Sequence, residues 1–398
     1  MIQALLIDLD DTLLENDVAR FLPAYFDLLA SDLSAFAPKD QAMAALLAGT
    51  KAMLANEDPE RTLAQVFFHT FGAATGASTP AMASVLERFY RESYPKLAGL
   101  TRPKDGAAEL LQLAVTRGLA VAVSTNPLMV RSAIEQRLDW AGVPVTVFDY
   151  ALLTDVETFH FAKPRPAYFA ETLAHLGRLP TEAVMIGNDP SEDLDPAAAL
   201  GLPVFHVAAA SGDGRASGDL RQAAAWLTEQ SSVEPSPTHP PEALIARFEA
   251  QLAALLGRLD RLGTANLREP GAGGGLAPLQ VVCHLRDVDR EVNLPRLRTF
   301  LTEADPFFSS IDTDHWILER HYLKEDPDDA IRGLVAARRA VTDSLRQLSP
   351  QEWKRRGRHS LLGPITLAEW TAVLAEHDLR HQAQVVVPGR ATDRRRDS

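Results

Sequence analysis

The sequence contains almost no cysteine: Cys283 is the only one among 398 residues. An intrachain disulfide is therefore excluded, which argues against a small secreted domain held together by disulfides. The sequence also lacks the run of about 20 apolar residues that spans a bilayer, and its opening MIQALLIDLDD reaches acidic residues before a signal peptide could develop. We therefore expect a cytoplasmic protein with no membrane partner.

Basic residues are also fewer than acidic residues, which gives a formal net charge of -13. Residues 1–230 contain 29 of the 53 acidic residues but only 17 of the 40 basic ones. Nucleic-acid binding usually requires a basic face that contacts phosphates. The charge distribution argues against a nucleic-acid partner and favours a small-molecule substrate.

Three short apolar runs in the first half of the chain predict buried strands, and each run ends in polar residues. These runs are residues 2–10, 118–126 and 182–189, and helical patterns precede the second and the third. Such alternation predicts an α/β fold with a doubly wound parallel sheet, whose ligands bind at the carboxyl ends of the strands. Residues 15–100 show helical periodicity without a convincing strand, so we expect a helical insertion over the site.

The second half of the chain has a different pattern, typical of an all-α four-helix bundle. A last helix of the first half is expected at residues 218–229, followed by a Pro/Ser-rich linker at residues 230–241. The four amphipathic helices are predicted at residues 241–262, 276–301, 328–348 and 366–386, and the tail at residues 390–398 is predicted to be disordered.

Carboxylates in DLDDT follow the first predicted strand, where Asp8 and Asp10 are two residues apart. Side chains at this spacing share a site only if the chain leaves strand geometry just after Asp8. A carboxylate that attacks phosphorus needs a second acid to protonate the leaving oxygen and a divalent metal to neutralise charge. Asp8 fits the nucleophile and Asp10 the acid, while Thr125, Lys163 and the Asp189/Asp193 pair supply a donor, a cation and further metal-binding oxygens.

These segments resemble the four motifs of the haloacid dehalogenase superfamily over residues 1–229, in the order DLDDT, Thr125 with Asn126, Lys163 before Pro164, and GNDPSED. The resemblance implies a Rossmann-like domain with a helical cap at about residues 15–100, and Mg²⁺ bound by Asp8, the carbonyl of Asp10 and Asp189. It assigns phosphate binding to Thr125, Asn126 and Lys163, and water-mediated metal binding or orientation of Lys163 to Asp193. In the commoner form of the fourth motif, aspartate directly follows glycine, whereas here Asn188 stands between that glycine and Asp189. The position of the metal ligand in this motif therefore stays open by one residue. An aspartate at position 10 favours a phosphatase over a dehalogenase.

A second candidate site lies in the predicted bundle, where His377 and His381 are one helical turn apart. Asp378 follows the first histidine where a zinc protease has glutamate, so protease chemistry is excluded. Together with His284 on the second bundle helix, the segment 242–389 resembles the DinB-like four-helix bundle family. The resemblance implies a divalent metal bound by the three histidines, with zinc, nickel and iron equally suited.

The leading hypothesis is a magnesium-dependent phosphatase that acts on a small phosphorylated metabolite through an aspartyl-phosphate, fused to a metal-binding bundle. The alternative is a thiol-dependent transferase, or a protein that senses a ligand or metal, with an accessory haloacid dehalogenase-like domain. A low-molecular-weight thiol is therefore a candidate partner, and a homodimer through the bundle is a further hypothesis. Cys283 is expected to be a small buried residue, and the basic residues at 354–358 a solvated loop.

Overall fold

The computed structural model describes residues 1–208, 214–230, 240–271 and 275–385. The chain divides into two compact units, Met1–Ser236 and Pro237–Ser398. Most of the predicted linker and all of the predicted tail lie outside the described residues. None of the helices in the described part of the chain combines the length and apolar character that a membrane span requires.

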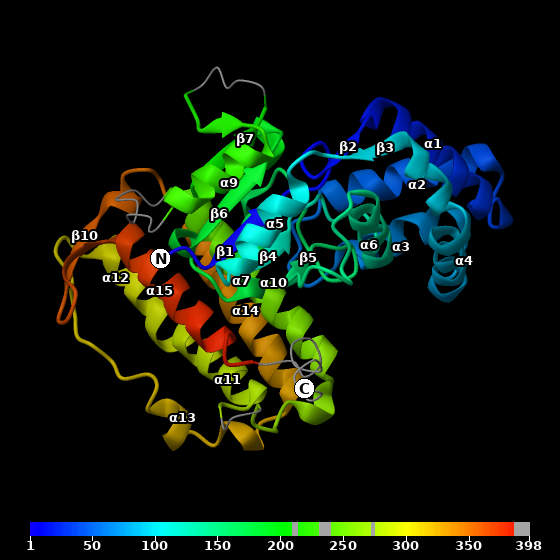
Figure 1. Cartoon of the computed structure of the whole chain (residues 1–398). Coiled ribbons are helices and arrows are strands. Elements are labelled where there is room, and N and C mark those ends of the chain that lie inside the picture. The colour runs from blue at the N-terminus through cyan, green and yellow to red at the C-terminus, as the bar shows by residue number, and fades with distance from the viewer. Residues whose placement is uncertain (209–213, 231–239, 272–274, 386–398) are drawn as a thin grey trace, which may run out of the picture. The chain divides into compact units, whose positions relative to one another are not determined.

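A six-stranded parallel sheet forms the centre of the first unit (Figure 1), which confirms the predicted α/β class. Its order is β5 (Leu152–Leu153), β4 (Ala120–Val123), β1 (Ala4–Ile7), β6 (Ala183–Gly187), β7 (Val204–Val207) and β8 (Ser217–Gly218). Every residue of β1 is buried, as expected for a strand covered on both faces. Ile7 is in register with Val123 and Ile186, so the three predicted strands end at the same level.

Both faces of this sheet are buried at β1 and β6, because alternate side chains of a strand point in opposite directions and every residue of these strands is buried. Leu5, Ile7, Val121 and Val184 belong to one apolar cluster with residues of the two packed helices α5 and α9. The helices that follow or cover the strands are α5 (Ala107–Thr116), α6 (Arg131–Trp140), α7 (Pro166–Leu176), α8 (Asp195–Ala199) and α9 (Leu220–Glu229), with short turns η3 (Pro180–Glu182) and η4 (Pro190–Leu194).

The segment predicted to be a helical insertion contains four helices (Figure 1). Their apolar side chains form a separate core cluster. They are α1 (Val18–Asp32), α2 (Lys39–Leu54), α3 (Leu63–Thr75) and α4 (Thr79–Glu92), with 3₁₀ turns η1 (Leu33–Ala35) and η2 (Tyr94–Leu100). An antiparallel pair that the sequence did not predict, β2 (Leu14–Asn16) and β3 (Thr101–Pro103), joins both ends of this cap to the sheet domain. The predicted helical cap is therefore confirmed, with a two-stranded base.

Four long helical segments form the second unit, as predicted. They are α10 (Pro241–Leu262), α11 (Pro278–Val288) continuing through the π-helical turn η6 (Asp289–Asn293) into α12 (Leu294–Thr302), α14 (Pro327–Arg346), and α15 (Leu367–Gln382). Helix α10 packs against α14 and α15, and α11 against α14. Apolar side chains from all four segments fill two adjoining clusters between them.

The shorter elements of the second unit were not predicted from the sequence. A small sheet is formed by β9 (Phe307–Phe308), β10 (Arg356–His359) and β11 (Gly363–Thr366), and short turns are η5 (Thr264–Asn266), α13 (Trp316–Glu319), η7 (Tyr322–Lys324) and η8 (Glu352–Lys354). The basic cluster was predicted to be a solvated loop, but Arg356 and Arg358 lie in the central strand of this sheet. The loop prediction was wrong there because β10 pairs with β11, just after it in the sequence, and with β9, about 50 residues before it.

Candidate active site and metal centre

The chain turns sharply after β1, at the point where the acidic residues begin. The amide of Leu13 donates to the carbonyl of Leu9 at 2.9 Å, and Asp11 adopts a left-handed conformation with φ of 55°. Strand geometry therefore ends directly after Asp8, as the two-residue spacing required. Asp8 and Asp10 consequently line the same pocket.

Lys163 connects two buried carboxylates at the floor of this pocket. Its Nζ lies 2.8 Å from Oδ1 of Asp8 and 2.5 Å from Oδ1 of Asp193. Burial opposes the ammonium charge, yet the carboxylates of Asp193 and Asp8 raise the pKa of Lys163 well above its usual range. The lysine is thus a fixed cation beside the candidate nucleophile.

The loop that carries Lys163 is anchored from below by a buried carboxylate of α7. Glu171 accepts hydrogen bonds from the amides of His160 and Phe161 at 3.1 and 3.3 Å. The same carboxylate contacts Nδ1 of His160 at 2.7 Å, and all of these groups are buried. This anchoring limits the positions that the following lysine can reach.

Asp193 organises the loop that follows β6. Its Oδ2 accepts from the amides of Asn188 and Asp189, both at 3.1 Å. A Cβ atom on Gly187 would collide with the Asp193 carboxylate, so glycine is required for this approach. Burial and the negative charge of Asp8 raise the pKa of Asp193 to about 6, although Lys163 opposes that shift.

Asn188, rather than Asp189, faces the first acidic motif. One end of the Asn188 amide lies 2.9 Å from the carbonyl oxygen of Asp10, 3.1 Å from the Thr12 hydroxyl and 3.3 Å from Oδ2 of Asp8. Oδ1 of Asp189 instead accepts from the amide and hydroxyl of Ser191, both at 2.8 Å, and from the next amide at 3.0 Å. The structure brings together Asp8, Asp10 and Asn188, and turns Asp189 to the start of the following helical turn.

Thr125 and Asn126 follow β4 and also line the pocket. The carbonyl of Thr125 accepts from the hydroxyls of Thr154 and Tyr168 at 2.7 and 2.8 Å, which fixes the backbone of this turn. Oδ1 of Asn126 is buried without a hydrogen-bond partner among the described residues. Both side chains are therefore placed to meet a ligand at the strand ends.

Arg137, which the sequence analysis did not single out, pairs with Asp10. The two side chains form an ion pair, and the Asn16 amide nitrogen also donates to Asp10, at 2.9 Å. Burial lowers the pKa of Arg137 to about 10. In the sequence, Arg137 looks like Arg131 on the same helix, so no local signal identifies it as the buried one.

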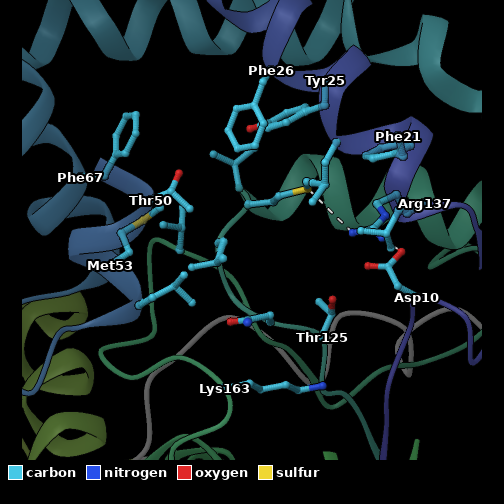
Figure 2. Close-up of a pocket in the computed structure, with 18 of the residues that line it drawn as sticks. Asp10, Phe21, Tyr25, Phe26, Thr50, Met53, Phe67, Thr125, Arg137 and Lys163 are labelled. Atoms are coloured by element: carbon cyan, nitrogen blue, oxygen red, sulfur yellow. Dashed lines mark hydrogen bonds and ion pairs between the residues drawn. The ribbon is translucent and has the colours of Figure 1, made fainter. Parts of the chain in front are cut away.

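A cavity of about 1210 Å³ extends from these residues into the cap. Figure 2 shows Thr125 and Lys163 at one end, Asp10 facing Arg137 at the side, and aromatic residues at the opposite end. Its polar end contains every site residue predicted in this unit: Asp8, Asp10, Thr125, Asn126, Lys163, Asp189 and Asp193.

In the second unit, the three predicted histidines come together. Nε2 of His284, on α11, lies 3.4 Å from Nε2 of His377. The ring centroids of His284 and His381 are 4.4 Å apart. Asp314, from the loop after β9, joins them: its Oδ1 lies 3.3 Å from Nε2 of His381. All four potential donor atoms lie within 4.8 Å of one another.

Buried charges support this histidine cluster from the side of α14. Nδ1 of His377 lies 3.3 Å from Oδ1 of Asp378, which forms an ion pair with Arg338. Arg338 also donates to Asp289 at 2.8 Å. Burial opposes the charge of Asp378, but Arg338 and His377 lower its pKa to about 2. The carboxylate thus holds Nδ1 of His377 and leaves Nε2 facing the cluster.

Protonation is disfavoured at two of these histidines, His284 and His381. Burial, together with the neighbouring His381 and His377, lowers the pKa of His284 to about 3, and burial likewise lowers the pKa of His381. Neutral imidazoles are the form that binds metals. Cys283 is not available as a nucleophile, because burial raises the pKa of its thiol to about 12.

Comparisons with known proteins match each unit to a family. The family model for haloacid dehalogenase-like hydrolases matches residues 2–201, and that of the DinB superfamily matches residues 247–385. Together these matches confirm both resemblances seen in the sequence.

Two curated relatives are phosphoglycolate phosphatases. The protein from Mesorhizobium japonicum is 29% identical over 124 residues, which cover 31% of this chain and 52% of that relative. The protein from Rhodospirillum rubrum is 28% identical over 207 residues, covering 51% of this chain and 78% of the relative. The chain thus spans about half the length of the first relative.

Two solved structures are similar to parts of this chain. YfiT from Bacillus subtilis, with an unusual four-helix bundle topology, is 25% identical, with 38% of this chain and 89% of that chain covered and a TM-score of 0.34. A HAD phosphatase from Thermococcus onnurineus is 22% identical, with 57% and 97% covered and a TM-score of 0.34.

Proposed function

The chain belongs to the haloacid dehalogenase-like hydrolases, and we propose on that premise that its first unit hydrolyses phosphomonoesters with the help of Mg²⁺. One observation carries this proposal. Asp8 lies at the end of a buried strand, held by Lys163 and open to the same pocket as Asp10. A carboxylate in this setting is suited to attack a phosphorus atom. Both curated relatives that match this unit are phosphatases, which supports the same assignment.

The residues of the pocket divide the reaction between them. Asp8 attacks phosphorus, and the bond to the leaving oxygen breaks as the aspartyl-phosphate forms. Asp10 leaves its ion pair with Arg137, takes up a proton from solvent, and gives this proton to the leaving oxygen. In the second step Asp10 takes a proton from water, which attacks phosphorus and releases inorganic phosphate and Asp8. Lys163 stays beside Asp8 and contacts the phosphoryl oxygens throughout.

The oxygen atoms next to Asp8 fit a magnesium ion. In one orientation of its amide, the Asn188 oxygen faces only the oxygens of Asp10, Thr12 and Asp8. Such a set is stable if the amide nitrogen turns inward or if a cation lies among the oxygens, and a hard cation prefers this donor type. We propose Asp8, the carbonyl of Asp10 and Asn188 as the ligands, with Asp193 holding Lys163. When bound, Mg²⁺ neutralises charge between the nucleophile and the phosphoryl group.

A test of this function uses the full chain and p-nitrophenyl phosphate. We expect release of nitrophenol that requires Mg²⁺ and stops when a chelator is added. A covalent intermediate should be trapped as a hydroxylamine-sensitive acyl phosphate. No turnover with Mg²⁺ on this ester or on a panel of phosphorylated metabolites would exclude a phosphatase.

We propose that the second unit binds one divalent transition metal through His284, His377 and His381. Three imidazole nitrogens converging with one carboxylate carry this proposal. If the unit is a thiol-dependent transferase, the thiol must come from a separate molecule, since Cys283 is buried and protonated. Calorimetric titration of the metal-loaded chain with low-molecular-weight thiols tests that alternative.

A further inference from the structure

The cavity above Asp8 is much larger than a phosphoryl group requires. Its volume of about 1210 Å³ exceeds the range of roughly 300–1,000 Å³ that is usual for pockets holding drug-sized ligands. A substrate with a two-carbon alcohol would leave most of this space unfilled. The size therefore indicates a large leaving group.

The far end of the cavity is apolar on several sides. Helix α1 contributes Phe21, Tyr25 and Phe26, and Figure 2 shows these rings opposite Thr125 and Lys163. Further apolar side chains come from the other three cap helices and from the turn after β4: Leu46, Met53, Phe67, Leu86, Leu128 and Met129. A ligand group in this space would contact mainly carbon, although the exposed Leu47 and Leu54 place part of the lining at the protein surface.

Cations that could hold a second acidic group are scarce in this lining. Among the lining residues, all of which the structure describes, the cations besides Lys163 are Arg137 and Lys51. Arg137 lies beside Asp10 at the side of the cavity rather than at its far end, and Lys51 is exposed. A carboxylate at the far end of a substrate would therefore be desolvated without a buried partner, which is costly.

We propose that the substrate is a phosphomonoester of a long apolar alcohol, with the phosphoryl group at Asp8 and the chain among the cap aromatics. This inference rests on the proposed phosphatase function and adds the substrate class. It distinguishes the chain from its phosphoglycolate phosphatase relatives, whose named substrate has a short acidic leaving group.

The test is a series of monoalkyl phosphates from butyl to decyl, each below its micellar concentration, with phosphoglycolate and p-nitrophenyl phosphate for reference. Burial of each added methylene should raise kcat/KM about three- to fourfold, or on the order of 100-fold from butyl to octyl. Most of this gain should appear in KM, because the chain binds equally in the ground and transition states.

Two outcomes separate the substrate class from the underlying function. A flat or falling series, or a preference for phosphoglycolate, with measurable turnover of p-nitrophenyl phosphate, overturns the apolar substrate and leaves the phosphatase intact. Absence of turnover on every ester overturns the phosphatase function and this inference with it.

A pair of variants assigns the selectivity to the cavity. Phe26→Ala removes a ring that lines it, whereas Phe36→Ala removes a similarly half-buried ring of the same cap that does not. For octyl and decyl phosphates, we expect Phe26→Ala to reduce the increase of kcat/KM with chain length at least threefold. Phe36→Ala should leave this increase unchanged. Equal slopes in both variants and the wild type would place the alkyl chain outside this cavity.

Discussion

The two units of this chain form their candidate sites from different donor atoms, oxygens in the first and mainly nitrogens in the second. In the first, charged oxygens gather where parallel strands end, and Lys163 balances the carboxylates of Asp8 and Asp193. In the second, imidazole nitrogens gather on two helices, and burial lowers the pKa of His284 to about 3. Oxygen donors favour Mg²⁺ and imidazoles favour transition metals. If the two proposed sites bind different metals, a mutation in one site should leave the metal content and the activity of the other site unchanged.

The largest expected effect is that of Asp8→Asn on the first site. An amide neither attacks phosphorus nor neutralises a cation, so phosphate release should fall by more than about 1,000-fold. The transition metal content of the second unit should stay the same. Steady-state kinetics and elemental analysis of the full chain check both statements. Near wild-type turnover of the folded variant would remove Asp8 from the role of nucleophile.

Asp10→Asn should slow turnover by about 100- to 10,000-fold through loss of proton transfer to the leaving oxygen. Esters whose leaving groups have a low pKa need this proton least, so p-nitrophenyl phosphate should suffer less than alkyl phosphates. The comparison requires kcat for both esters with wild type and variant. An equal loss for aryl and alkyl esters would show that Asp10 is not the acid.

On the other side of the comparison, His284→Ala and His381→Ala should each abolish tight binding of one transition metal per chain. Loss of a direct ligand should weaken affinity by more than the 10- to 100-fold typical of changes to supporting residues. His315→Ala is the matched control, since His315 is exposed and pairs with Glu319 in the same unit. Elemental analysis measures the metal.

Phosphatase activity should be retained in all three histidine variants. A parallel loss of phosphatase activity in His284→Ala and His381→Ala would break the separation between the sites. Unchanged metal content in both would mean that these histidines are ordinary residues of the bundle.

Much of this arrangement was predictable because local patterns encode it. An apolar run ending in acid placed Asp8 at a strand end, and a spacing of four placed His377 and His381 on one helical face. The four long bundle helices followed from their periodicity for the same reason.

Contacts between segments far apart in sequence were not predictable. Arg137 has the same local context as exposed arginines, and only the fold brings it to Asp10. Asp314 lies in a loop without periodicity, 30 residues from His284 and 67 from His381. The strands β9 and β10 pair across about 50 residues and are too short to leave a pattern.

Either of two adjacent residues of the fourth motif, Asn188 or Asp189, could be the Mg²⁺ ligand of the first site. Asn188 faces Asp8 and the Asp10 carbonyl, while Asp189 accepts bonds from the next turn. Asn188→Ala removes a proposed direct ligand and should therefore raise the Mg²⁺ concentration for half-maximal activity by more than about 100-fold. Asp189→Ala should raise it less, through distortion of the turn. Magnesium titrations of activity compare the two, and a larger effect of Asp189→Ala would restore Asp189 as the ligand.

The smallest expected effect concerns Asp314, the one oxygen donor in a cluster of nitrogens. Its carboxylate lies 3.3 Å from His381, so it can complete a four-ligand site or leave the fourth position to an incoming molecule. Because its side chain is 71% exposed, the interaction should be weaker than that of the buried His284. Asp314→Ala should lower metal affinity on the order of tenfold, less than the histidine variants. Asp312→Ala removes a neighbouring carboxylate that caps the amide of His315 and serves as the control. Competition titrations with a chromophoric chelator measure both, and the visible spectrum of the cobalt form reports a change in the number of ligands. Equal affinities and spectra for the two variants would show that the metal site is made by the histidines alone.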